Sequence, residues 1–346
     1  MQLTDKDILL HLSISRISFL KFFEKKILLE NIDSADKLSL SSINDIENLI
    51  GRNLTKAVWN GKENFHCAEI ALHFCRTLGI QVVLFSDEDY PEALRQIDDC
   101  PYLLFCRGDV RILKNRCVSV VGTRRLTTSG KIAARQFAYD AVIDGCNVIS
   151  GLANGADGFA HQGAIDAYFD YLERDGNPIV LGKTIAVLPS SIDEILPASH
   201  KRMATQIIQS GGLLVSEYEP GMGMAKWHYV ERNRIIAALS PATVVIEAPA
   251  GSGALITADF ALEYGRDVMF HEIAFCENAQ KVSHLVYTDL EKAHAKGTVS
   301  RYKLENTPEK YLEAGAPVVK NYKDYCSALV EAPGQRKNIP KQGELF

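Results

Sequence analysis

The chain has 346 residues, of which 47% are hydrophobic and 23% are charged, and its formal net charge at pH 7 is −5. This composition is typical of a globular protein with one large and one smaller domain, and it excludes collagen-like and low-complexity chains. Because the net charge is slightly negative, any contact with nucleic acid has to come from a local basic patch.

The sequence also argues against membrane insertion and metal binding. Its apolar runs are all shorter than the roughly 18 residues of a membrane span, and its start lacks the features of a signal peptide. Eight cysteines are scattered without a Cys-x-x-Cys pair, which favours buried free thiols in a reducing compartment. We therefore expect a cytoplasmic protein that contacts no membrane and has no metal or other cofactor.

Residues 1–80 are predicted to be entirely helical. Apolar residues recur there at helical spacing, Ser41 and Ser42 are expected to cap a helix, and the amphipathic run 66–78 ends at Gly79. Residues 50–54 leave two interpretations open. They could form the glycine turn of a DNA-gripping helix-hairpin-helix, or a loop in a small helical bundle, which is favoured.

From residue 81 onward, strands are predicted to alternate with helices. Residues 82–85 form a first strand, and 90–109 form a linking segment that packs on the following domain. The later strands are 117–121, 146–150, 184–188, 213–217, 243–247 and 267–271, which predicts an α/β fold with a mostly parallel sheet and helices on both faces. Residues 169–182 look like an insertion, and 272–312 are not assigned. A short strand at 317–319 and a helix at 324–330 complete this domain.

The expected organisation is therefore a helical domain at 1–80, a sheet domain at 81–330 and a tail at 331–346. The tail is rich in proline, glycine, lysine and glutamine, which predicts disorder.

Three of the predicted strands run into a glycine-containing loop that is followed by a helix. These loops contain residues 122–125, 151–155 and 251–253. Loops beyond the carboxyl ends of parallel strands can line one crevice. Glycine lets the backbone approach a ligand, and the next helix points unpaired N–H groups at it, which favours phosphate. We therefore expect the three loops to meet as one electropositive slot.

The first loop carries the strongest phosphate-binding groups. Gly122 follows the strand, Thr123 supplies a hydroxyl, and Arg124 and Arg125 supply guanidinium donors next to a helix that opens near 129–131. The loop matches neither the dinucleotide fingerprint nor the Walker loop. An arginine paired with a surface carboxylate is the alternative, and phosphate binding is favoured over it.

The second loop offers successive backbone N–H groups, as an anion nest does. It consists of Ser150, Gly151, Leu152, Ala153, Asn154 and Gly155. Asp157 and His161 follow at i and i+4 on one helix face. They could act as a general base and its orienting partner, or Asp157 could cap the helix while His161 braces the loop.

Residues 226–236 are the densest mixture of basic and aromatic side chains in the chain. Single-stranded nucleic acid suits such a mixture, because bases stack on rings while cations follow the phosphates. The candidate contacts here are Lys226, Tyr229, Arg232, Asn233 and Arg234. Alternatively, Trp227 or Tyr229 belongs to the core and Arg232 pairs with Glu247.

The third loop adds N–H donors and hydroxyls from Gly251, Ser252 and Gly253. Glu247 precedes it at a strand end, where we expect the carboxylate to anchor an arginine rather than touch an anion. Thr257 is a further supporting residue. Histidine, serine and cysteine residues form no recognisable catalytic signature, so we expect no enzymatic activity.

In this order the motifs resemble the DNA-processing protein A family, also called DprA or Smf. The resemblance extends from about residue 90 to residue 266. The residues that carry it are 90–91, 104–105, 108–109, 120–125, 150–153, 155, 157, 161, 185–188, 216–218, 232–237, 239–240, 245–248, 252–253, 257–258, 263 and 265–266.

The resemblance implies a small helical domain, similar to SAM or helix-hairpin-helix domains, on an extended Rossmann-like domain. It implies a homodimer that binds single-stranded DNA, protects it, and helps to load RecA recombinase onto it in natural transformation, that is, in competence and DNA recombination. By the same resemblance, Arg124 and the Gly122 loop hold phosphate, Lys226 supplies a cation and Tyr229 supplies a stacking ring.

The chain also departs from the family pattern. Asn154 stands where the family usually has a lysine or arginine, and Tyr229-Val230 replaces the usual Phe-Pro. Residues 188–191 lack the glycines that usually follow that strand, and the region after Phe270 is divergent. The residues after Val330 are too few for the winged helix of some members.

Gln342, Leu345 and Phe346 end the chain in a sequence that resembles the short peptide by which bacterial repair proteins dock on the DNA polymerase sliding clamp. A plain solvated tail is the favoured alternative.

Two other functions are weighed against DNA binding. One is a LOG-type nucleotide phosphoribohydrolase, or a nucleotide sensor of the same superfamily. Residues 250–254 read Ala-Gly-Ser-Gly-Ala instead of the Pro-Gly-Gly-x-Gly-Thr loop of those enzymes, which argues against hydrolysis. The other is a purely structural partner protein, which the arginine-rich loops disfavour.

Overall fold

A computed structural model gives the structure of residues 4–175 and 181–330. The predicted tail, with Gln342, Leu345 and Phe346, lies outside the described residues. Among the described residues, no helix combines the length and the apolar character needed to cross a membrane.

The part of the chain before the sheet is helical, as predicted. Its helices are α1 (Asp5–Ser15), α2 (Phe22–Asn31), α3 (Ala35–Leu40), α4 (Ile43–Ile50) and α5 (Gly61–Thr77). Ser42 caps α4, and Gly51 ends that helix in the left-handed conformation with φ of 69°. The Nε of Arg52 lies 2.6 Å from a carboxylate oxygen of Glu24. This arginine is therefore paired within the bundle, which favours the loop interpretation of residues 50–54.

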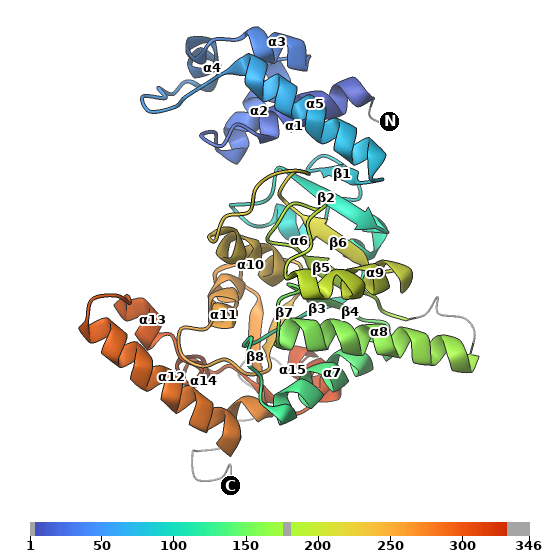
Figure 1. Cartoon of the computed structure of the whole chain (residues 1–346), viewed down its shortest axis with the longest axis vertical. Coiled ribbons are helices and arrows are strands. Elements are labelled where there is room, and N and C mark those ends of the chain that lie inside the picture. Colours follow the sequence, from blue (N-terminus) through green and yellow to red (C-terminus); the bar gives the residue numbers. More distant parts are fainter. Residues whose placement is uncertain (1–3, 176–180, 331–346) are drawn as a thin grey trace.

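Within residues 4–175 and 181–330, nine strands form one sheet in the order β1-β2-β6-β5-β4-β3-β7-β8-β9 (Figure 1). β1 and β2 are antiparallel to each other, β2 is antiparallel to β6, and the strands from β6 to β9 are parallel. The bounds are β1 Gln81–Leu84, β2 Leu103–Gly108, β3 Cys117–Val121, β4 Asn147–Ser150, β5 Thr184–Val187, β6 Leu213–Ser216, β7 Ala242–Val245, β8 Asp267–His271 and β9 Val318–Val319.

Helices cover both faces of the sheet, which confirms the predicted fold class. One face carries α7 (Thr128–Ile143), α8 (Ala156–Asp175), α9 (Lys201–Gln209) and α15 (Tyr322–Val330). The opposite face carries α10 (His228–Ala238) and α11 (Gly253–Glu263). All described residues of β3, β4 and β7 are buried, as expected of strands that are covered on both sides.

Some predicted segments have a different structure. The expected linking segment 90–109 contains the short helix α6 (Glu92–Arg95) and the strand β2, which is part of the sheet and pairs with β1 and β6. The expected insertion at 169–182 begins as a continuation of α8, as far as Asp175. The unassigned region forms α12 (Glu277–Ala295), α13 (Arg301–Glu305) and α14 (Pro308–Glu313). Figure 1 shows α12 as a long helix at the periphery of the molecule.

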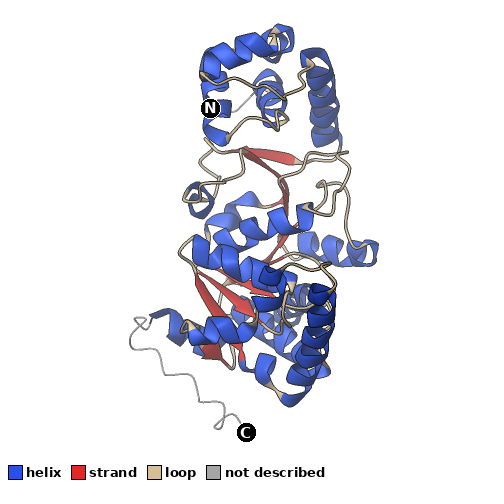
Figure 2. Cartoon of the chain, turned by 90° about the vertical axis from the view of Figure 1, so that its left-hand side faces the viewer, coloured by secondary structure: helices blue, strands red, loops and turns tan. Residues whose placement is uncertain are grey.

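The N-terminal helices lie at one end of the molecule (Figure 2), next to β1 and β2, which are labelled in Figure 1. Their core is continuous with that of the sheet. One buried apolar cluster contains Leu12 and Ile14 from α1, Leu103 and Phe105 from β2, and Leu188 after β5. A division into independent domains at residue 80 therefore stays a prediction.

The strand order reverses between β3 and β7. From β3 the chain moves outward through β4, β5 and β6, and it returns to add β7, β8 and β9 on the other side. Ligands of open α/β sheets bind outside the carboxyl ends of the strands at such a switch point. The loops that follow β3 and β7 are the first and third glycine-containing loops.

Candidate functional site

The three loops meet in space. A cavity of about 700 Å³ is lined by residues of the first loop, of the second loop and of the third loop, together with the exposed side of α10. The candidate residues in its lining are Gly122, Thr123, Arg124, Arg125, Ala153, Tyr229, Arg232, Asn233, Gly251, Ser252 and Gly253, with Asp157 and Thr257 among the supporting residues.

The first loop is fixed to the strand β7 beside it. Thr127 caps α7, and its N–H and hydroxyl donate to the two carboxylate oxygens of Glu247, at 2.9 and 2.5 Å. The backbone N–H of Thr123 donates to the carbonyl of Glu247 at 2.6 Å. The expectation that Glu247 anchors an arginine is wrong, because this buried carboxylate anchors the start of α7.

Arg232 lies beneath the second loop instead of reaching into solvent. Its side chain is buried, with 3% of the residue exposed, and it donates to the carbonyls of Gly151 and Val187. Burial lowers the pKa of Arg232 to about 10, while the nearby Asp157 opposes that shift. Gly151 is required here, because a Cβ at this position would overlap the guanidinium. Neither pairing with Glu247 nor a direct DNA contact fits these contacts.

The anion-nest interpretation of the second loop is wrong for the amides of Gly151, Leu152 and Ala153. The N–H groups of Gly151 and Ala153 donate to one carboxylate oxygen of Asp157, at 3.2 and 3.3 Å. The N–H of Leu152 donates to Nε2 of His161 at 3.3 Å. His161 therefore braces the loop, as one of the two interpretations expected, and Asp157, which that interpretation assigned to the helix cap, braces the loop as well.

The contacts of His161 define its protonation state. Nε2 accepts a hydrogen bond, and Nδ1 lies 2.7 Å from the hydroxyl of Thr184, which itself donates to the carbonyl of Val148. The ring is thus a neutral imidazole protonated at Nδ1. Burial, together with the cationic Arg232 and with His200, lowers the pKa of His161 to about 3. A buried neutral ring that holds two neighbours suits a structural role.

The remaining residues of the second loop are divided between the core and the surface. The hydroxyl of Ser150 is buried and donates to the carbonyl of Val120 at 2.6 Å, and Leu152 is fully buried. Gly155 has φ of 83° and packs so closely on the first loop that a Cβ would overlap the carbonyl of Thr123. Asn154 is exposed, but it does not line the cavity.

The exposed Arg124 and the half-buried Tyr229 form a cation–π pair in the cavity. The guanidinium of Arg124 lies over the Tyr229 ring, 4.9 Å from its centroid. Within the described residues, the side chains of Arg124 and Arg125 make no hydrogen bond or ion pair, and both are exposed. Lys226 is exposed just before α10, outside the lining of the cavity.

The third loop is held from both sides. Asn233 and Thr257 both donate to the carbonyl of Gly253, at 3.2 and 3.3 Å. The N–H of Gly251 donates to the carbonyl of Asn306 at 2.9 Å. The hydroxyl of Ser252 caps α11 by accepting from Ala254. These contacts place Asn233 and Thr257 in supporting positions next to the cavity.

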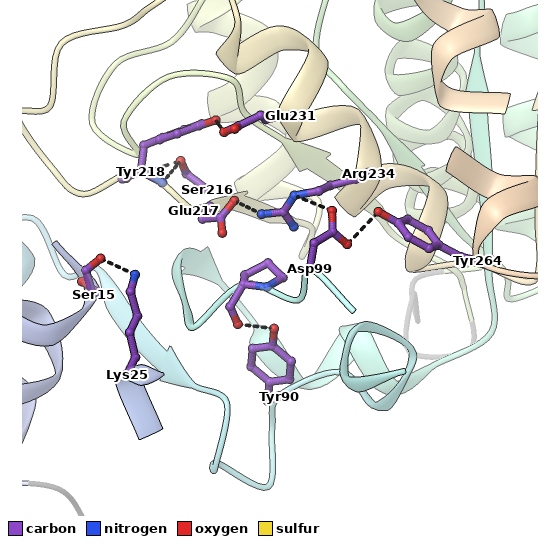
Figure 3. Close-up of polar contacts among 11 residues, drawn as sticks. Ser15, Lys25, Tyr90, Asp99, Ser216, Glu217, Tyr218, Glu231, Arg234 and Tyr264 are labelled. Atoms are coloured by element: carbon purple, nitrogen blue, oxygen red, sulfur yellow. Dashed lines mark hydrogen bonds and ion pairs between the residues drawn. The ribbon is translucent and has the colours of Figure 1, made fainter. Parts of the chain in front are cut away.

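Arg234, predicted as a DNA contact, belongs to a network of ion pairs within the protein. It points away from the cavity and contacts Glu217 at 2.5 Å and Asp99 at 3.5 Å (Figure 3). Asp99 in turn accepts from the hydroxyl of Tyr264 at 2.8 Å. Residues 232 and 234 are two positions apart on a helix, so their side chains leave it in different directions. The prediction that both contact DNA is therefore wrong for Arg234.

One wall of the cavity comes from the unassigned region. Val286 and Leu290 of α12 line it together with Tyr302, Lys303 and Asn306. Sequence reasoning missed these residues. The available signal was the spacing of Val282, Val286 and Leu290, which repeats every four residues as on one face of a helix.

The cavity carries more positive than negative charge. Among the described residues that line it, Arg124, Arg125, Arg232 and Lys303 are cationic and Asp157 is the one carboxylate. Burial raises the pKa of Asp157, although Arg232 and backbone N–H groups oppose this shift. Arg124, Arg125 and Lys303 therefore face the solvent, whereas the carboxylate of Asp157 already accepts hydrogen bonds from the second loop.

Comparison with known proteins identifies the family. A sequence model described as "DNA recombination-mediator protein A" matches residues 81–303, which is more than half of the chain. The chain belongs to this family. The match confirms the resemblance to DNA-processing protein A, and it includes all three loops and α12.

Curated relatives agree with this assignment. The DNA processing protein DprA of Bacillus subtilis is 36% identical over 194 residues, which cover 56% of this chain and 61% of that protein. Protein Smf of Borreliella burgdorferi is 28% identical over 265 residues, which cover 77% of this chain and 79% of that protein. The match with the first of these relatives thus spans about three fifths of that protein's length.

Two solved structures have the same fold. DNA processing protein A from Streptococcus pneumoniae superposes with a TM-score of 0.63 at 26% identity, over 94% of this chain and 98% of that one. DNA processing protein A from Helicobacter pylori gives a TM-score of 0.53 at 24% identity, over 72% of this chain and 96% of that one. The second structure is described as having a single-stranded DNA binding mode, and its likeness to this chain shows the fold alone.

Proposed function

We propose that this protein binds single-stranded DNA in the crevice between β3 and β7. The observation that carries the proposal is the contact between Arg124 and Tyr229 at the topological switch point. Among the described residues the guanidinium of Arg124 makes no hydrogen bond or ion pair, and it lies 4.9 Å from the centroid of the Tyr229 ring. A nucleotide can use both groups, because its phosphate pairs with the guanidinium and its base stacks on the ring.

The surroundings of this pair support binding rather than catalysis. Asp157, His161 and Glu247 resemble catalytic groups by residue type, but each is buried and bonded to the loops. A general base needs to reach the proton that it removes, and these groups already hold backbone or threonine donors. The proposal therefore assigns no catalytic step, and it disfavours the phosphoribohydrolase alternative.

The wider role follows from the family. DNA processing proteins of this family are the curated relatives, and the H. pylori protein is described as binding single-stranded DNA. We extend the proposal to protection of single strands and help in loading RecA recombinase during transformation, in the cytoplasm and as a homodimer. Docking of residues 342–346 on the polymerase sliding clamp is a separate part of the proposal.

The test is a titration of fluorescent oligothymidylate at several salt concentrations. For single strands, log K falls with log salt by about 0.7 for each neutralised phosphate. We expect Arg124→Ala to flatten this slope and Tyr229→Ala to weaken binding with little change in slope. Arg111→Ala is the matched control, because this exposed arginine is paired with Asp109 and lies outside the cavity.

Two results would contradict the proposal. Equal affinity for duplex and single-stranded DNA would show that the crevice does not select unpaired bases. Release of free base from nucleotides would favour the phosphoribohydrolase instead.

A further inference from the structure

A second cavity adjoins the first on the other side of Arg125. Its volume is about 470 Å³, within the range of small-ligand sites. The two cavities share Thr123, Arg125, Pro249 and Ala250. A ligand that follows the first loop can therefore pass from one cavity into the other without leaving the protein surface.

The outer wall of this second cavity is one face of α12. Gln280, Ser283, His284 and Tyr287 occupy positions i, i+3, i+4 and i+7 of the helix, and all four line the cavity. Helix geometry places residues with this spacing on the same side. The wall thus presents an aromatic ring and three polar side chains toward the loop that carries Arg125.

These four side chains are available to contact a ligand. Within the described residues, the side chains of Gln280, Ser283, His284 and Tyr287 make no hydrogen bond, ion pair or ring contact. Tyr287 is half-buried, so part of its ring is already shielded from water. A flat partner that stacks on this ring would find donors and acceptors one helical turn away.

The charge of the cavity decides which part of a nucleotide fits. Glu247 and Glu309 line it, and their carboxylates would repel a phosphate. Arg125, at the border with the first cavity, is the cation that can hold a phosphate. A neutral, planar and polar-edged group therefore suits the second cavity, with its phosphate at the border.

We propose that the second cavity is a subsite for one nucleobase of the bound single strand, with Tyr287 as its stacking ring. This inference rests on the proposed function, and it adds the α12 wall to the binding surface. The backbone would follow Arg124 and Arg125, and neighbouring bases would lie on Tyr229 in one cavity and on Tyr287 in the other.

The experiment combines protein variants with an abasic scan of the DNA. A fluorescent oligothymidylate of about 12 nucleotides, within the usual range of site sizes, is titrated with one base removed at each position in turn. We expect Tyr287→Ala to weaken binding about 5- to 150-fold, the range of a lost stacking contact. At one position, removal of the base should lower the affinity of the wild-type protein for the oligonucleotide and leave the affinity of Tyr287→Ala unchanged.

Two variants control for changes in the helix itself. Tyr287→Phe keeps the ring and should retain most of the affinity. Leu285→Ala alters an exposed side chain on the same helix, outside the cavity lining, and should bind like the wild type. Circular dichroism shows whether α12 is preserved in each variant.

The outcomes separate the two proposals. If every abasic position weakens Tyr287→Ala as much as the wild type, the subsite is refuted even though Arg124→Ala still flattens the salt slope. If the wild type binds no single strand, or Arg124→Ala leaves the salt slope unchanged, the proposed function itself fails. If the abasic site at one position weakens binding by the wild type but not by Tyr287→Ala, the subsite is supported.

Discussion

At the residue scale, two arginines that both belong to predicted DNA-binding motifs have different roles. Arg124 is exposed and lies over an aromatic ring, whereas Arg232 is buried and donates to the carbonyls of Gly151 and Val187. Both side chains belong to motifs that suggested phosphate binding. The two side chains differ in burial. Burial depends on the whole fold and cannot be inferred from the residues next to each arginine in the sequence.

We expect Arg232→Lys to destabilise the protein without removing its DNA site. Nη1 of Arg232 donates to both carbonyls and Nε donates to Oδ1 of Asn233. The single nitrogen of a lysine cannot reproduce these contacts, so a buried polar group is left without a partner. The free energy of unfolding in urea should fall by about 1–3 kcal/mol, the cost of leaving a buried polar group without its partner. Arg124→Lys should show the reverse, with stability within about 0.5 kcal/mol of wild type and weaker DNA binding. Unchanged stability of Arg232→Lys would contradict this assignment.

His161 should make the protein less stable in mild acid. The pKa of His161 in the folded state is about 3, below its ordinary value of 6.5. Between these values the unfolded chain takes up a proton that the folded chain does not, so stability falls as pH falls from 6.5 toward 3. The loss amounts to about 2 kcal/mol between pH 7 and pH 5.

Urea unfolding at pH 5, 6 and 7 measures this effect. His161→Gln, which does not titrate, should lose the His161 part of the acid-side slope, while His11 and His271, whose pKa values burial also lowers, keep their part. His66→Gln should keep the whole slope because His66 is exposed. Asp157 contributes with the opposite sign, since its pKa is raised by burial. If the free energy of unfolding of His161→Gln changed with pH as it does in the wild type, the inference that the His161 ring is neutral in the folded protein would be refuted.

At the element scale, strands and loops were predicted from the sequence and the α12 wall was not. The strands at 117–121 and 267–271 have the predicted bounds, because short, mostly apolar runs between turn signals have few alternatives. In contrast, α12 has a single fully buried residue among its 19, Ala279. A helix that packs so lightly leaves a weak periodic pattern.

The attachment of α13 and α14 depends on one carboxylate. Asp259 of α11 accepts from the Tyr302 hydroxyl at 2.5 Å, from the Asn306 amide at 2.8 Å and from the Tyr311 hydroxyl at 2.8 Å. The carbonyl of Asn306 in turn holds the N–H of Gly251. Asp259 thus connects the third loop with the part of the first cavity's wall that Tyr302 and Asn306 form.

We therefore expect Asp259→Ala to loosen residues 301–313 locally. Losing three hydrogen bonds to a charged acceptor should lower the free energy of local opening by about 1–3 kcal/mol, which hydrogen exchange of these amides measures. Asp289→Ala is the control, because this carboxylate is exposed and pairs weakly with Lys292 on α12. Unchanged exchange in Asp259→Ala would mean that apolar packing alone holds these helices.

At the scale of the whole molecule, the helical part and the sheet share one apolar cluster. The sequence predicted a boundary near residue 80 from the change in periodicity. Periodicity reports the type of element, but it does not report which elements bury their side chains together. Leu12 and Ile14 pack in the same cluster as Leu103, Phe105 and Leu188.

This shared core predicts a single unfolding transition. The chain has two tryptophans, Trp59 before α5 and Trp227 before α10, so each part carries its own fluorescent reporter. The variants Trp59→Phe and Trp227→Phe isolate these signals. We expect their urea transitions to coincide, as two-state unfolding requires. Two separate midpoints would show that the helical part folds as an independent domain.

The bracing of the three loops has a consequence for the thermodynamics of binding. Thr127, Asp157, His161, Asn233 and Thr257 already fix the backbone of the crevice in the free protein. Such a receptor has little freedom left to lose, so the entropic penalty of association falls mainly on the flexible strand. The stiffness of the oligonucleotide, more than any rearrangement of the protein, should then set how tightly different sequences are held.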